Sequence, residues 1–366
     1  MKVIKIISVF SLVASFYSCQ QEMPTTTEGK AKATFVVIGD TSVVAQVPIY
    51  APLKNAKVIM SSEYGIMIRY TDDKGILNLD GIPSATYSIT ARLSHPKYPN
   101  ILLVGTTKNI EIVSGKVVLD TIKATQVANT GIAINEIYAC GPVNNIFFFY
   151  DQFIELYNYS EETKYLDGMI IMRVSGNTEN GGKGPGADEG NDGDLDGVTY
   201  IFQIPGKPGE KNYPFYPRTY KVLASTGINH KTNVSTSIDL SKADWEFYNQ
   251  YSVSDFDNPT VPNLINLRSD RTVDFLINLV SDVIILASGS DSYWEDGIDF
   301  STVLDGVDYK SSTTAKRTMD NRIDKSFALS PPRYSGKSIQ RREPGGDSND
   351  AISDWEIINS PTPGRQ

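Results

Sequence analysis

Short runs of alternating apolar and polar residues recur along the first third of the chain, and each run is bounded by Gly, Pro, Asp or Asn. Alternation with a period of two is typical of strands with one buried face, and the bounding residues are those that tight turns require. Residues 31–125 are therefore predicted to form a small β-sandwich. The predicted strands are Ala33–Ile38, Ala56–Met60, Met67–Thr71, Ile76–Leu79, Thr86–Leu93, Ile101–Thr106, Ile110–Val113 and Val117–Ile122.

The alternation resumes after a short boundary of turn-forming residues at Gln126–Gly131. Residues 131–366 are predicted to form a second β-sandwich with long loop insertions. One short helix is predicted from Ser241 to Tyr251, because Ser241 and Asp244 have the spacing of a capping box. The predicted fold class is all-β, with two sandwiches and one short helix. The strands predicted in the second sandwich are Ile132–Tyr138, Phe153–Ser160, Ile170–Val174, Val198–Ile204, Tyr220–Ala224, Asp274–Leu279 and Val283–Ala287.

Residues 1–18 have the features of an export signal, with a basic start and an apolar stretch too short to cross a bilayer of about 30 Å. The stretch ends at Ser18-Cys19, which resembles the lipobox of bacterial lipoproteins, although Phe16 stands where that pattern has Leu. The resemblance implies a lipidated, palmitate-bearing Cys19 and a polar tether over residues 19–30. Cleavage by an ordinary signal peptidase is the alternative. Gln20 is not the Asp that signals inner-membrane retention, so we expect a lipid anchor in the outer membrane, on its periplasmic face or at the cell surface.

The segment from Asp72 to Ile89 carries a turn motif and a strand motif. Asp72-Asp73-Lys74-Gly75 places Gly where a turn needs a positive φ, and Ile82-Pro83 leads into a strand through Tyr87. This D-x-x-G and I-P-x-x-x-Y-x-I order resembles the carboxypeptidase-regulatory-like or transthyretin-like domain, with Ala85 in place of the usual Gly. The resemblance implies a spacer or stalk and says little about function.

The second sandwich resembles the lamin-tail domain, which is immunoglobulin-like. The resemblance rests on Ile134–Ile137 (INEI), Ile154–Asn158 (IELYN), Leu166–Gly168 (LDG) and a closing series of motifs. It implies that the two ends of this sandwich meet although they are nearly 180 residues apart. The complete pattern resembles a family of outer-membrane lipoproteins without an assigned function. The closing motifs are Ser338–Arg341 (SIQR), Asp347–Asp350 (DSND), Asp354-Trp355 and Pro361–Gly364 (PTPG).

Two glutamates in this pattern invite a catalytic interpretation. Glu136 and Glu155 lie on alternating strands and could form a carboxylate pair. Arg341 and Arg342 lie near the end of the same sandwich, so we interpret the two glutamates as their ion-pair partners.

Composition narrows the classes of function. The chain has 34 Lys and Arg against 43 Asp and Glu, a net charge of −9, which argues against nucleic acid as a partner. Two His and two Cys are too few for a zinc finger, an iron–sulfur cluster, a haem with two His ligands or a disulfide scaffold. The sequence has no G-x-S-x-G, H-E-x-x-H or complete P-loop motif. We therefore predict a protein that is not an enzyme.

One acidic loop is a candidate metal site. Asp192, Asp194 and Asp196 match the opening D-x-D-x-D-G of a calcium loop, in which carboxylates alternate ahead of a turn-forming Gly. Gln203 stands at the twelfth position, where an EF-hand has Glu. Bound Ca²⁺ and a solvated acidic loop are both open at this stage; no other cofactor is predicted.

Aromatic residues in the loops are candidate ligand contacts, because rigid rings supply contact area at a low entropy cost. These residues are Tyr213, Tyr216, Tyr293 and Trp294, and the alternative is that they cap the ends of the sandwich. Thr121, in Asp120-Thr121-Ile122, resembles the short pattern that some bacteria O-glycosylate.

These observations favour a membrane-anchored lipoprotein with a non-catalytic binding role. By resemblance, its partner is an outer-membrane transporter of the TonB-dependent type that imports a scarce nutrient, such as a glycan or an iron source, or it binds a surface ligand directly. A structural or adhesive surface protein, stiffened by calcium, is the first alternative. A carbohydrate-active enzyme that uses carboxylates is the second.

Overall fold

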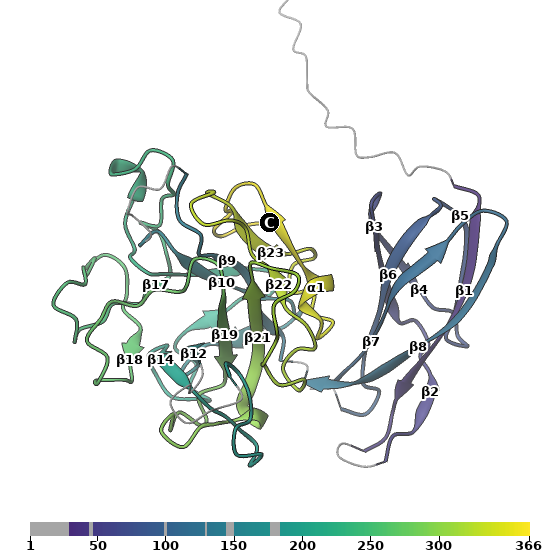
Figure 1. The fold of residues 1–366 in the computed structure, drawn as a ribbon. Helices are drawn as coiled ribbons and strands as arrows, with labels where there is room; N and C mark the ends of the chain where they lie inside the picture. The colour runs from purple at the N-terminus through teal and green to yellow at the C-terminus, as the bar shows by residue number, and fades with distance from the viewer. Residues whose placement is uncertain (1–28, 44–46, 99–100, 129, 144–149, 176–183) are drawn as a thin grey trace, which may run out of the picture.

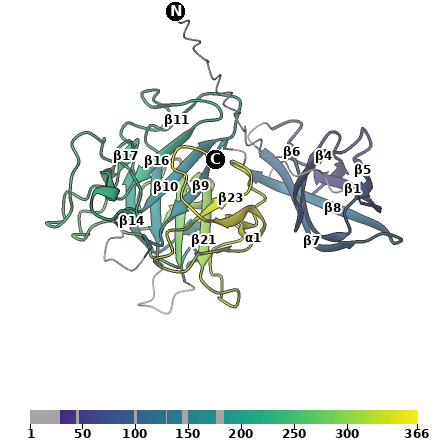
Figure 2. The ribbon, with the colours of Figure 1, turned by 90° about the horizontal axis from the view of Figure 1, so that it is seen from above.

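The computed structural model describes residues 29–43, 47–98, 101–128, 130–143, 150–175 and 184–366. Within these ranges the regular structure is almost entirely β-strand, as the alternation predicted. The helical segments there are α1 (Ala351–Asp354) and the 3₁₀ turns η1 (His230–Thr232) and η2 (Phe300–Thr302). No helix in the described ranges is long and apolar enough to cross a membrane. Figures 1 and 2 show two bodies, which we call the N-terminal unit (residues 29–128) and the C-terminal unit (residues 130–366).

The N-terminal unit is an eight-stranded sheet in the order β2-β1-β8-β7-β6-β3-β4, with β5 paired to β1 along the same edge as β2. Its core takes alternate side chains from the strands; on β1 these include Phe35 and Val37. The chain 101–112, predicted as two strands, is one continuous strand. The strands are β1 (Ala31–Asp40), β2 (Tyr50–Pro52), β3 (Lys57–Ser62), β4 (Gly65–Tyr70), β5 (Ile76–Ile82), β6 (Ala85–Ser94), β7 (Ile101–Ile112) and β8 (Val117–Ala128).

The turn motif of this unit has a clear physical basis. The Asp72 carboxylate accepts hydrogen bonds from the Lys74 and Ile76 backbone N–H groups, each at 2.8 Å. Gly75 has a φ of +73°, and a Cβ there would lie 2.7 Å from the Val37 carbonyl oxygen, so only Gly fits.

The C-terminal unit packs two six-stranded sheets face to face. The first has the order β17-β16-β10-β9-β23-β24, from β17 (Trp245–Glu246), β16 (Tyr220–Ala224), β10 (Phe153–Asn158), β9 (Ile132–Tyr138), β23 (Ser338–Arg341) and β24 (Trp355–Ile358). The second has the order β18-β14-β12-β19-β21-β22, from β18 (Ile265–Asn266), β14 (Val198–Gln203), β12 (Ile170–Val174), β19 (Asp282–Ala287), β21 (Val303–Lys310) and β22 (Ala328–Leu329). Two small ribbons pair β11 (Lys164–Tyr165) with β15 (Pro214–Phe215) and β13 (Asp194–Leu195) with β20 (Ile298–Asp299).

The main core lies between these two sheets. It joins Leu156 of the first sheet to Phe202 and Leu286 of the second. The outer face of each sheet is covered by a further apolar cluster, so β9, β10 and β19 are buried along their full length. The two ends of this unit meet, as expected: β9 pairs with β23, with Glu136 opposite Gln340.

The helix predicted from Ser241 to Tyr251 is wrong. The Ser241 hydroxyl donates to the Asp239 carboxylate at 2.6 Å, which forms a turn instead of a cap. Trp245 and Glu246 then form β17 in parallel with β16, and Trp245 and Phe247 enter the main core. Tertiary burial of these rings overrides the local helix signal. The short helix of the described chain lies instead at Ala351–Asp354.

Candidate functional site

The two units meet where β3, β6 and β7 of the N-terminal unit face one loop of the C-terminal unit, residues 342–354, which we call the interface loop. Figure 1 shows α1, at the end of this loop, on the side of the C-terminal unit that faces the N-terminal unit. Lys57 forms an ion pair with Glu343, and Lys108 forms another with Asp350. The Ser88 hydroxyl lies 3.3 Å from a further loop hydroxyl, that of Ser353.

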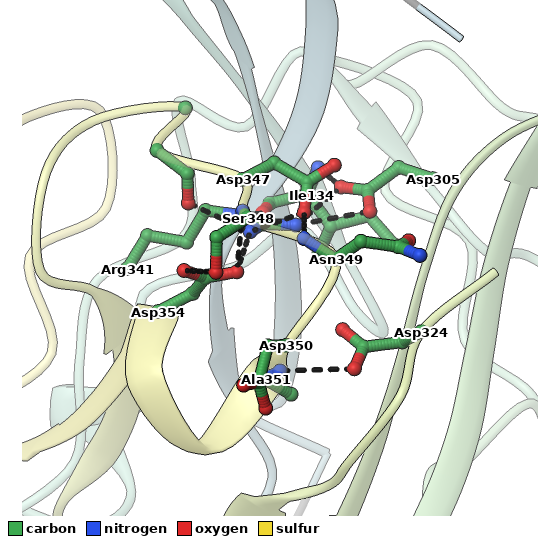
Figure 3. A network of polar contacts seen from close by, with 12 residues as sticks. Ile134, Asp305, Asp324, Arg341, Asp347, Ser348, Asn349, Asp350, Ala351 and Asp354 are labelled. Atoms are coloured by element: carbon green, nitrogen blue, oxygen red, sulfur yellow. Dashed lines mark hydrogen bonds and ion pairs between the residues drawn. The ribbon is translucent and has the colours of Figure 1, made fainter. Parts of the chain in front are cut away.

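A buried polar network holds the interface loop in place (Figure 3). Arg341, which has no exposed surface, donates two hydrogen bonds of 2.9 and 2.8 Å to the Asp305 carboxylate. It also donates to the carbonyl oxygens of Ile134 at 2.7 Å and Gly346 at 2.8 Å. The guanidinium therefore ties β23 to β9, β21 and the start of the loop. Both bonds to Asp305 come from the Nη2 atom of Arg341, and charge-assisted bonds of this kind are stronger than those between neutral groups.

The network contains more carboxylates than cations. Asp347 and Asp354 lie 3.5 and 3.6 Å from the Arg341 guanidinium, in addition to Asp305. Burial raises the pKa of Asp354 to about 7, and the neighbouring Asp347 adds to this effect. Burial likewise raises the pKa of Asp305 to about 6, although Arg341 opposes the rise. The carboxylates consequently compete for one cation, and the raised pKa of Asp354 leaves that carboxyl partly protonated near neutral pH.

Two cavities lie between the units, and together we call them the interdomain cleft. The larger has a volume of about 280 Å³. The smaller, about 40 Å³, has room for water. Residues from both units line each cavity, and Arg92 of β6 and Glu343 of the interface loop line both. Ligand sites are often found at such junctions.

Arg92 is the cleft cation without an ionic partner. Lys57 pairs with Glu343, and Arg218 pairs with Glu161, whereas no hydrogen bond or ion pair joins Arg92 to any residue of the described ranges. Its guanidinium carbon instead lies 6.0 Å from the ring centroid of Tyr159 in the C-terminal unit.

Glu343 has one satisfied and one unsatisfied oxygen. Its Oε1 atom accepts from Lys57, whereas its Oε2 atom is buried and has no protein partner within the described chain. A buried acceptor left unpaired in this way costs about 1–3 kcal/mol. The cleft thus holds an unpaired donor group and an unpaired acceptor on opposite walls.

Glu136 and Glu155 do not pair with Arg341 or Arg342, so that interpretation is wrong. Arg341 binds aspartates, and Arg342 pairs with Glu356. The reason is strand alternation: Gln340 shares the face of Glu136 and donates to it at 3.0 Å, so the next residue, Arg341, points to the opposite face.

The two glutamates instead hold the C-terminal tail. Glu136 accepts from the Thr362 N–H at 3.0 Å and Glu155 accepts from the Gly364 N–H at 2.6 Å. Burial raises the pKa of both carboxyls, to about 8 for Glu155.

The acidic loop predicted to bind calcium is ordered by its own hydrogen bonds. Asp194 lies on β13, opposite Asp299, and the Asp196 carboxylate accepts from the Glu189 N–H at 2.9 Å. Partial burial and the nearby Asp192 and Asp299 raise the pKa of Asp194. Among the residues that the structure describes, no group of three or more His, Cys, Asp or Glu side chains is arranged to hold a metal ion. Calcium at Asp192, Asp194 and Asp196 stays a prediction.

The predicted aromatic contacts are not gathered into one site. Tyr213 packs against the main core and contacts Trp245 edge-on at 5.7 Å, whereas Trp294 packs against the cluster on the outer face of the second sheet. The Arg268 guanidinium stacks on Trp294, 3.6 Å from the ring centroid. Tyr293 and Tyr216 are 64% and 60% exposed. All four rings stay candidate ligand contacts, and only Tyr213 and Trp294 are packed against apolar clusters.

Two further predicted sites are the glycosylation site Thr121 and the lipidation site Cys19. Thr121 is exposed on β8, next to Asp120, so an enzyme could reach it. Cys19 lies outside the described residues. Sequence reasoning missed Arg92 and Glu343, because the two residues belong to different units and share no motif.

Comparisons with known proteins agree with this fold. Residues 217–296 match a family model described as "Protein of unknown function (DUF4876)". The crystal structure of a DUF4876 family protein from Bacteroides thetaiotaomicron VPI-5482 aligns with a TM-score of 0.52 at 18% identity, over 89% of this chain and 94% of that one. This likeness shows that the two chains share a fold. No curated protein matches the chain.

Two further solved structures align with much lower scores. One is described as a "putative carbohydrate binding protein" from Bacteroides uniformis ATCC 8492, with a TM-score of 0.19 and 12% identity, over 40% of this chain and 62% of that one. The other is the Bacillus anthracis TIE protein, with a TM-score of 0.18 and 13% identity, over 52% of this chain and 28% of that one. Scores this low carry no argument about fold or function. The lamin-tail-like and carboxypeptidase-regulatory-like assignments stay predictions.

Proposed function

We propose that this chain is a non-catalytic binding protein, anchored through lipid on Cys19 to the outer membrane, and that its ligand site is the interdomain cleft. The observation that carries the proposal is the pair Arg92 and Glu343 on the walls of this cleft: Arg92 has no ionic partner in the described chain, and the buried Glu343 Oε2 atom accepts no hydrogen bond there. A cation without an ionic partner and a buried, unpaired acceptor, both between two units, are suited to bind a ligand that supplies the missing contacts.

The chemistry of the cleft supports binding. The Ser88 and Ser353 hydroxyls contact each other. Both histidines are buried elsewhere: the Nδ1 atom of His95 accepts from the backbone of Lys97, and the Nε2 atom of His230 contacts the Thr226 carbonyl. Burial also lowers the pKa of His230. Neither imidazole lines the cleft as a general base.

The proposed setting is an accessory role to an outer-membrane transporter of the TonB-dependent type. The support is the signal-like segment 1–18 and its lipobox, followed by a polar tether. The tether would hold the two units near the membrane, where a ligand captured in the cleft could be passed on.

Membrane attachment is tested by fractionation. In a Gram-negative host, the wild-type chain should sediment with outer membranes, and Cys19→Ser should be released in soluble form, because it has no acyl chains to partition into lipid. Wild-type protein in the soluble fraction would refute the anchor.

The cleft is tested by thermal melts of the full chain in detergent against sugars and iron-carrying ligands, since a ligand that binds only the folded state raises Tm. We expect a ligand that stabilises the wild type and Tyr293→Ala but not Arg92→Gln. Tyr293 is exposed, so its removal leaves the fold intact. Loss of the shift in Tyr293→Ala, with retention in Arg92→Gln, would move the site to the loop aromatics and refute the cleft.

A further inference from the structure

The larger cavity of the interdomain cleft differs in charge from the rest of the chain. The protein carries a net charge of −9, yet the larger cavity is lined by three cations, Lys57, Arg92 and Arg218, and by one carboxylate, Glu343. A positive concavity on an acidic protein concentrates anions locally.

Arg92 is positioned to bind an acidic group. Lys57 and Arg218 are each engaged by a glutamate, so Arg92 holds the uncompensated charge. The Tyr159 ring near its guanidinium restrains it without using its donors. A planar guanidinium with free N–H groups matches the two oxygens of a carboxylate or a sulfate.

Glu343 requires a ligand that also donates hydrogen bonds. Its buried Oε2 atom has no partner in the described chain, and a fully ionised sulfate or carboxylate has no hydrogen to offer it. Sugar hydroxyls both donate and accept. The smaller cavity is lined by Arg342 and by Asp347 and Asp354, whose carboxylates can also accept from sugar hydroxyls. It adds five hydroxyl-bearing residues: Ser61, Ser88, Thr90, Ser348 and Ser353.

We propose that the interdomain cleft binds an acidic sugar, with the carboxylate or sulfate on Arg92 and a ring hydroxyl donating to Glu343. This inference rests on the proposed binding function and adds the class of ligand. The larger cavity has a volume of about 280 Å³, close to the lower limit of about 300 Å³ for small-ligand pockets. This size suits a short saccharide.

The test is calorimetric titration of the full chain in detergent with four probes: glucuronic acid, glucose 6-sulfate, glucose and inorganic sulfate. We expect either acidic sugar to bind at least about tenfold more tightly than glucose and than sulfate, because only an acidic sugar satisfies both walls. Preference for one acidic sugar identifies the acidic group. Equal binding of glucose and glucuronic acid, or no binding of either acidic sugar, would overturn the proposal.

Substitutions test the contributions of Arg92 and Glu343 to binding one at a time. Arg92→Gln should weaken the acidic sugar about tenfold and Arg92→Lys should weaken it less, whereas Arg69→Gln is the matched control, because Arg69 is exposed on β4 and lines neither cavity. Glu343→Gln should weaken the acidic sugar but not inorganic sulfate. A melt of each unliganded variant checks that it folds.

The outcomes also distinguish this inference from the proposed function. If a neutral sugar binds and Arg92→Gln abolishes its binding, the cleft is the site but the acidic preference is wrong. If an acidic sugar binds equally to the wild type and Arg92→Gln, both the inference and the cleft as the site are wrong.

Discussion

Glu155 lies in the middle of β10 with no exposed surface, next to Glu136 on β9. Its carboxylate accepts hydrogen bonds from the Asn135 amide at 3.1 Å and from the Gly364 N–H at 2.6 Å. Burial raises its pKa from 4.5 to about 8, which is more than these hydrogen bonds offset. The folded protein therefore retains a proton here that the unfolded chain has lost.

The sign of the effect on stability follows directly. The stability that this group contributes is fully present below pH 4.5, where both states are protonated, and it is lost as the pH rises towards 8. At about 1.4 kcal/mol per pKa unit, roughly 3 kcal/mol of this loss falls between pH 5.5 and pH 8.

Glu155→Gln should remove this loss, because an amide does not titrate. The variant should be less stable than the wild type at pH 5.5, by about 1–3 kcal/mol, since its amide nitrogen cannot accept from one of the two donors. At pH 8 the difference in stability between the variant and the wild type should disappear or change sign. Urea unfolding followed by tryptophan fluorescence measures this, because Trp245, Trp294 and Trp355 all lie in the C-terminal unit.

The control is Glu162→Gln, whose side chain is 80% exposed and should leave the pH dependence unchanged. If Glu155→Gln loses as much stability as the wild type between pH 5.5 and pH 8, the buried carboxyl does not titrate as argued.

Three further outcomes test other parts of the structure. Arg341→Leu should lower the free energy of unfolding by about 3–5 kcal/mol in urea, because it leaves buried carboxylates without their cation. Gly345→Ala should lower Tm, because Gly345 has a φ of +63° and a Cβ there would lie 2.5 Å from the Tyr159 Cβ; an unchanged Tm would contradict this packing. Arg268→Ala should make Trp294 more accessible to acrylamide quenching, because it uncovers one face of the ring.

Much of the fold could be predicted from local patterns. β9, β12 and β16 begin and end at the residues where the alternation predicted them. The turn at Gly75 followed from its residue types, and the pairing of β9 with β23 followed from a resemblance at both ends of the second sandwich. These features are encoded over a few neighbouring residues or in paired motifs.

The errors arose where distant residues decide the outcome. The capping-box signal at Ser241 was overridden because Trp245 and Phe247 are buried in a core assembled from other segments. The partners of Arg341 depend on which face of β23 it occupies, and the spacing of the arginines does not reveal this. Arg92 and Glu343 line one cleft only because two units pack together, so no motif could have indicated the cleft.

Because the chain is synthesised from its N-terminus, the cleft can form only after its C-terminal wall has been made. Lys57 and its partner Glu343 are separated by 286 residues. β9 cannot pair with β23 until β23 has been synthesised, some two hundred residues later. Contacts of such long range form late and slowly. Until residues 338–341 arrive, β9 presents a free edge to other nascent chains, which is a route to aggregation. Because residues 338–354 complete both the sheet and the cleft wall, a chain that stops before them should be cleared by proteolysis and not persist as a partly active binder.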